Sequence, residues 1–104
     1  MNKPASSIEA GRQDAERLIK DEQIDFDPFI AISDIYLVRK TVPVSFAALE
    51  KTLEESDPEL LEAVKSCTAR REQEMGAAFS YDEYAEGMVE GVAAVWEKIR
   101  DQVL

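Results

Sequence analysis

The segment DPFIAISDIYLVRK, residues 27–40, is an almost unbroken apolar run around which the rest of this 104-residue chain must pack. Between Phe29 and Val38 only Ser33 and Asp34 are polar, so nearly every face of the segment avoids water. The run is too short to span a bilayer, which needs roughly 20 apolar residues. We therefore expect it to form the buried centre of a globular fold.

The start of this segment favours a helix over a strand. Asp27 is a good N-cap residue, and Pro28 follows at the first helical position, where its missing N–H group costs nothing. Polar and apolar residues do not alternate between Phe29 and Val38, which also favours a helix over 28–40. Residues 35–38 are β-prone, however, and a short strand through 35–44 is the alternative.

Similar start signals predict the remaining helices. Ser6-Ser7-Ile8-Glu9 and Ser80-Tyr81-Asp82-Glu83 have the pattern of capping boxes, Ser45 is an N-cap, and Asp57-Pro58 repeats the cap-plus-proline start. We expect helices over residues 6–23, 28–40, 46–55, 58–75 and 81–103. The predicted fold is all-α, with one domain over residues 1–104 in which four main helices and the short helix 46–55 form a small irregular bundle.

The last helix has the clearest amphipathic pattern. Its apolar residues recur every three or four positions and comprise Tyr81, Tyr84, Ala85, Met88, Val92, Val95, Trp96, Ile99 and Val103. We expect Trp96 to anchor the core. Gly87, Gly91 and Ala94 form a second stripe of small residues, which indicates that another backbone approaches closely there.

The composition excludes several kinds of chemistry. The chain has no histidine and a single cysteine, so it lacks the usual serine and cysteine nucleophile activation, histidine metal ligands and an intrachain disulfide. Its four glycines are too scattered for a nucleotide-binding loop. We therefore predict that the protein is not an enzyme and holds neither a metal nor a cofactor.

Two residues of helix 58–75 have structural rather than chemical interpretations. Cys67 lies on the apolar stripe of this helix and is predicted to be a buried core residue rather than a reactive thiol. Arg71 lies on the same stripe. Either its stem covers the core, or it forms a salt bridge with Asp34, the charge stranded in the apolar segment.

Negative charge dominates the surface. The net charge is −10, from 12 basic and 22 acidic side chains, and most of the excess lies in the second half of the chain. Nucleic acid and anionic membranes are therefore repelled, whereas a basic or nucleic-acid-binding protein is attracted. The residues predicted to contact such a partner are the acidic and tyrosine side chains Glu54, Glu55, Asp57, Glu62, Tyr81, Tyr84, Glu86 and Glu90.

The segment from Ala48 to Ala63, with its Asp-Pro-Glu-Leu helix start, resembles the segment that precedes the DNA-binding unit in addiction-module antidote proteins. The resemblance covers less than a third of the chain. The helix-turn-helix that should follow Gly76 is absent, so we do not assign the chain to that family. Helices 46–55 and 58–75 do not form such a unit either, because Glu59 and Glu62 would face phosphates.

These observations predict a small, acidic, non-catalytic protein that binds and neutralises or regulates a protein partner, as immunity proteins, antitoxins and nucleic-acid mimics do. One alternative is a homo-oligomeric structural or assembly protein, a dimer that pairs through Gly87, Gly91 and Ala94 or through residues 29–38. Another is a small-molecule sensor with a pocket lined by Tyr36, Tyr84 and Trp96. The N-terminus lacks the apolar core of a secretory signal, which predicts a cytoplasmic location.

Overall fold

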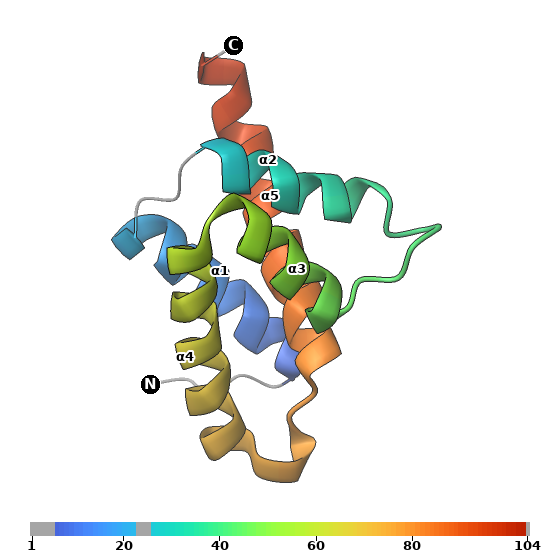
Figure 1. Ribbon diagram of the computed structural model, residues 1–104, viewed down its shortest axis with the longest axis vertical. Coiled ribbons are helices and arrows are strands. Elements are labelled where there is room, and N and C mark those ends of the chain that lie inside the picture. The colour runs from blue at the N-terminus through green and yellow to red at the C-terminus, as the bar shows by residue number, and fades with distance from the viewer. Residues whose placement is uncertain (1–5, 23–25, 104) are drawn as a thin grey trace.

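Five α-helices and one short 3-10 turn form a compact all-α globule, and the described residues contain no strand (Figure 1). The computed structural model describes residues 6–22 and 26–103. The elements are α1 (Ser7–Glu22), α2 (Phe26–Leu37), α3 (Phe46–Ser56), α4 (Pro58–Met75), η1 (Gly76–Ala78) and α5 (Tyr81–Val103). The all-α prediction is confirmed, and four of the five predicted helices begin within a residue of the expected position.

The predicted caps explain these boundaries. The hydroxyl groups of Ser6, Ser45 and Ser80 each accept a hydrogen bond from the backbone N–H three residues later, at 3.2, 3.1 and 3.3 Å. The Asp57 carboxylate accepts from the N–H of Leu60 at 3.1 Å, with Pro58 at the first helical position. Each cap satisfies an amide group that the helix itself leaves unpaired.

The apolar segment forms a helix rather than a strand, but the helix differs from the prediction at both ends. It begins at Phe26, so Asp27 lies in its first turn and is not the cap. It ends at Leu37, three residues early, and beyond it the N–H groups of Arg39 and Thr41 donate to the carbonyls of Tyr36 and Val38, three residues back rather than four, as in a turn. The alternative of a strand over 35–44 is wrong, since no strand occurs among the described residues.

Helix α5 is the central element, and it contacts α1, α2 and α3 (Figure 1). The buried apolar side chains come from all five helices and include Ala15, Leu18, Phe29, Ile32, Leu49, Leu53, Leu61, Val64, Met88, Val89 and Val92. No helix within the described ranges is both long enough and apolar enough to cross a membrane.

The backbones of α1 and α5 nearly touch. A Cβ atom on Gly87 would lie 1.9 Å from the carbonyl oxygen of Ile8, and one on Gly11 would lie 2.1 Å from that of Tyr84. The predicted close approach at Gly87 is confirmed, and the approaching backbone belongs to the same chain. Gly87 and Gly91 therefore pack inside the protein, which corrects the alternative that places a dimer contact on them.

Candidate partner-binding surface

The α5 helix carries a row of four carboxylates that we call the α5 acidic stripe: Glu83, Glu86, Glu90 and Glu97. Their spacing of three, four and seven residues keeps them on one side of the helix. Glu83, Glu86 and Glu97 are exposed, whereas Glu90 is half-buried and forms an ion pair with Arg12 of α1 at 2.9 Å. Sequence reasoning identified Glu86 and Glu90 but omitted Glu97, although the same helical spacing extends to it.

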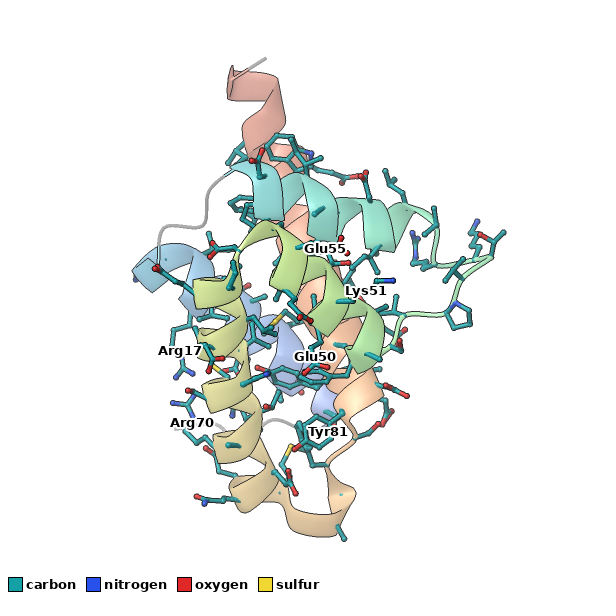
Figure 2. The ribbon with its side chains drawn as sticks, viewed as in Figure 1. Arg17, Glu50, Lys51, Glu55, Arg70 and Tyr81 are labelled. Carbon is teal, nitrogen blue, oxygen red and sulfur yellow. The ribbon has the colours of Figure 1, made fainter. Side chains whose placement is uncertain are left out.

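A second acidic group lies on α3 and α4 and consists of Glu54, Glu55 and Glu62, which are all exposed. Figure 2 shows Glu55 on α3 together with Glu50 and Lys51. Lysines interrupt the negative charge here, since Lys51 is exposed and Lys65 of α4 lies 3.8 Å from Glu50.

Asp57, at the junction of α3 and α4, is half-buried, and its carboxylate already caps α4. Its carboxylate therefore stabilises the start of α4, and Asp57 adds only its negative charge to a partner-binding face.

The two acidic groups face different ways. Helix α3 contacts α5 near Tyr81, whose ring lies 5.1 Å from that of Phe46. Tyr81 and Glu90 are nine residues, or two and a half turns, apart, so they lie on opposite sides of α5. The α5 acidic stripe therefore points away from α3, and the residues predicted as one partner-binding set form two separate surfaces.

The two predicted tyrosines differ in accessibility. Tyr81 is 41% exposed and donates a hydrogen bond to Glu72, which raises the pKa of its phenol (Figure 2). Tyr84 is completely buried, so it is not available to a partner. Its place in the partner-binding set is corrected: Tyr84 lies on the side of α5 that packs against α1.

Tyr84 belongs instead to a buried polar cluster that we call the Asp14 centre. Asp14 is 1% exposed and accepts hydrogen bonds from Arg71 Nε at 3.1 Å, Arg71 Nη2 at 2.8 Å and the Tyr84 hydroxyl at 2.7 Å. Arg17 and Arg70 place further guanidinium nitrogens 3.3 and 3.6 Å from the same carboxylate. Figure 2 shows these two half-exposed arginines at the outer edge of α1 and α4.

The Asp14 centre corrects the hypothesis that Arg71 pairs with Asp34. Arg71 is buried and bonded to Asp14, and this hydrogen bond raises its pKa, whereas Asp34 is exposed on α2. Sequence reasoning missed Asp14, although a signal was present, because this residue lies three after Gly11 and four before Leu18 on the inner side of α1.

The titratable groups around the Asp14 centre favour their protonated forms. Burial raises the pKa of the Cys67 thiol, and burial together with the nearby charge of Asp14 raises the pKa of Tyr84. The Sγ atom of Cys67 lies 3.7 Å from Arg17 Nη2, but desolvation outweighs this contact. A protonated, buried thiol is a weak nucleophile, so the cluster is suited to holding α1, α4 and α5 together.

The other side of α5 is open. A hollow of about 60 Å³ lies between α2 and α5, and we call it the α2–α5 groove. Its lining comprises Ile30, Ser33, Asp34, Tyr36 and Leu37 of α2 and Ala93, Trp96 and Glu97 of α5. Trp96 was predicted to anchor the core, but it is only half-buried and packs on Phe29 at 6.0 Å between ring centroids.

The groove lies in the most apolar part of the protein surface. Five large hydrophobic side chains are exposed among the described residues, and four of them lie on α2 or the turn after it. These four are Ile30 (44% exposed), Leu37 (70%), Val38 (48%) and Val42 (57%). The segment predicted to be buried on nearly every face therefore has one uncovered side.

Two polar features accompany this apolar surface. Asp34 and Glu97 line the groove, and neither forms an ion pair within the described part of the chain. Ser33 is 6% exposed, yet its hydroxyl oxygen has no hydrogen-bond partner within residues 6–22 and 26–103. Buried hydroxyl groups are almost always paired, so this one is a notable exception.

Comparisons with protein-family models, with curated proteins and with solved structures found no match to this chain.

Proposed function

We propose that this protein is a non-catalytic binding protein that neutralises or regulates a basic or nucleic-acid-binding protein partner. The observation that best supports the proposal is the α5 acidic stripe, in which three of four carboxylates are exposed and form no ion pair within residues 6–22 and 26–103. Such a row of uncompensated charge attracts a basic partner and speeds its association.

The Asp14 centre supports binding over catalysis. Its carboxylate accepts hydrogen bonds from the Tyr84 phenol and from Arg71, and its cysteine is buried. These groups are engaged in the fold and lie away from the surface. We propose accordingly that the protein works through the shape and charge of its surface.

The small-molecule sensor has less support than a protein-binding role. Tyr36 and Trp96 both line the α2–α5 groove, but Tyr84 is buried on the other side of α5. The volume of about 60 Å³ is well below the several hundred Å³ that small-molecule and cofactor pockets typically offer. A space of this size suits a single side chain.

The experiment that tests the proposal compares the two acidic surfaces. The tagged protein is used as bait in a lysate of the native host at low and high salt, with quantitative mass spectrometry as the readout. We expect one basic protein in near-stoichiometric amount at low salt and its loss at high salt, because screening weakens exposed charge pairs.

Two triple variants with the same change in charge locate the contact. E83Q/E86Q/E97Q removes most of the α5 acidic stripe, and E54Q/E55Q/E62Q removes the acidic group of α3 and α4. We expect the first variant to lose the partner and the second to retain it. Recovery of the bait alone under all conditions, or equal recovery of the partner by both variants and the parent protein, contradicts the proposal.

A further inference from the structure

The α2–α5 groove has the features of a site for another protein segment. It combines exposed apolar side chains with two carboxylates and a buried hydroxyl group that have no ion-pair or hydrogen-bond partner among the described residues. We propose that this groove docks a basic amphipathic helix of a partner protein, whose apolar side chains contact Ile30, Leu37 and Trp96 and whose lysine or arginine side chains pair with Asp34 and Glu97. This inference rests on the proposed function, because it specifies the contact through which the basic partner is held.

The spacing of the apolar residues suits a helix. Ile30 and Leu37 are seven residues apart on α2, so they lie on the same side of the helix and about 10 Å apart along its axis. An amphipathic helix that lies along α2 presents its own anchor residues at the same interval of two turns. The hollow between these two positions accepts one side chain of that helix.

The charges select a basic partner helix. Asp34 and Glu97 border the apolar surface from opposite helices, and Glu97 also ends the α5 acidic stripe, so negative potential extends from the groove along α5. One cation lies close by: the guanidinium of Arg39 is held 3.7 Å from the centroid of the Tyr36 ring and donates to the Tyr36 carbonyl at 2.8 Å, so it offsets part of this charge and leaves one carboxylate in excess.

A second copy of the chain is a poorer occupant. Pairing about a two-fold axis places the same patch on both sides of the interface. Asp34 and Glu97 of both copies would then lie in one interface, between molecules that each carry a net charge of −10. Like charges brought together in this way oppose association.

The Ser33 hydroxyl is the observation that separates this groove from an incidental apolar patch. Ser33 lines the hollow and is more than nine-tenths buried, and its hydroxyl oxygen has no hydrogen-bond partner among the described residues. A lysine ammonium on the docked helix only donates, so it supplies the hydrogen bond that this oxygen can accept.

The test measures binding of a synthetic 18-residue model helix with leucine on one face and lysine on the other, by the fluorescence of Trp96. This residue is the single tryptophan of the chain and lines the groove, so it reports occupation directly. We expect saturable binding with a shift of the emission maximum, and no binding of the matched helix in which glutamate replaces lysine.

Paired variants distinguish binding in the groove from nonspecific electrostatic attraction between the acidic protein and the basic helix. Leu37→Ser should weaken binding of the model helix about tenfold or more, because it removes an apolar anchor. Val42→Ser removes an exposed valine (57%) that does not line the groove, and should leave the affinity within about twofold. In the same way, D34N/E97Q should weaken binding more than E83Q/E86Q, which removes two charges elsewhere on α5.

Three outcomes overturn the inference. The first is equal weakening by Leu37→Ser and Val42→Ser. The second is self-association of the free protein in sedimentation experiments that Leu37→Ser abolishes, because the occupant is then a second copy. The third is a host partner that E83Q/E86Q/E97Q loses but Leu37→Ser retains, which overturns the groove and leaves the proposed function intact. Failure of the proposed function itself appears as the absence of any host partner.

Discussion

Helix α5 packs against α1 on one side and against α2 on the other, and the two contacts are built differently. Toward α1 the backbones nearly touch at Gly11 and Gly87, and the buried carboxylate of Asp14 is surrounded by hydrogen-bond donors. Toward α2 a hollow remains, and the buried hydroxyl of Ser33 has no partner in the described part of the chain.

The difference indicates which side of α5 holds the fold together and which side is free to bind. Buried polar groups stabilise a fold when all of their hydrogen bonds are made, and they destabilise it when one is missing. The Asp14 centre meets this condition within the chain. The α2–α5 groove does not, and a protein partner that completes it would gain both apolar contact and a hydrogen bond.

The largest loss of stability that we expect comes from a substitution that disrupts the Asp14 centre. Asp14→Ala leaves the buried guanidinium of Arg71 and the hydroxyl of Tyr84 without their main acceptor. Removing one partner of a buried ion pair typically costs about 3–5 kcal/mol. We expect a loss of this size in the free energy of unfolding, measured by urea denaturation and followed by circular dichroism.

Asp34→Ala is the matched control for this experiment, because it removes the same side chain from the exposed side of α2. We expect it to change the free energy of unfolding by about 0.5 kcal/mol or less. A loss below about 1 kcal/mol for Asp14→Ala would mean that the Asp14 centre does not hold the fold together.

The second prediction concerns alkaline pH. The folded protein raises the pKa of Cys67 above the value of about 8.5 for a free thiol and that of Tyr84 above the value of about 10 for a free phenol. The unfolded chain therefore loses these protons first as the pH rises, and the native state becomes less stable. Each group contributes a slope of about −1.4 kcal/mol per pH unit above its unfolded pKa.

Urea denaturation between pH 7 and 11 measures this slope. Stability should be constant with respect to both groups below about pH 8.5 and should fall above it, first through Cys67 and then through Tyr84. Tyr84→Phe removes one titrating group, so this variant starts less stable at pH 7 but should lose stability less steeply above pH 10. Parallel curves for the parent protein and the variant would contradict the prediction.

Four of the five helix starts were predictable because local chemistry sets them, and α2 is the exception, since it begins at Phe26, before Asp27. A serine or aspartate hydrogen-bonds an amide three residues along the chain, and proline restricts the backbone at its own position. Both effects act within one turn, so Ser45, Asp57 and Ser80 could be interpreted without knowledge of the tertiary structure.

The two sides of α5 were not predictable in the same way, because their contacts are distant in sequence. Asp14 is hydrogen-bonded to Arg71 and Tyr84, which follow it by 57 and 70 positions in the sequence. Only its place on the inner side of α1 indicated that it is buried. Asp34 was the more prominent charge, but it lies on the uncovered side of α2. The composition of residues 27–40 indicated that the segment is apolar, and it carried no information about which side lacks a neighbouring helix.

The smallest expected effect, and the most direct test of the difference between the two sides, is at Ser33. Ser33→Ala removes a buried hydroxyl group that has no hydrogen-bond partner and replaces it with the best helix former. We expect the free energy of unfolding to rise by about 1 kcal/mol, because the cost of burying an unpaired polar group disappears. Affinity for the leucine–lysine model helix should fall by about two- to tenfold, which is the worth of one hydrogen bond.

Ser45→Ala is the control, since the Ser45 hydroxyl caps α3 by accepting from the N–H of Ala48. Its loss should lower the free energy of unfolding by about 1 kcal/mol and leave binding of the model helix unchanged. Opposite signs of the two stability changes would show that the Ser33 hydroxyl weakens the free protein, and a loss of affinity for Ser33→Ala alone would show that it strengthens the complex. Equal losses of stability would mean that Ser33 is already paired in the folded protein, and the α2–α5 groove would then be as complete as the Asp14 centre.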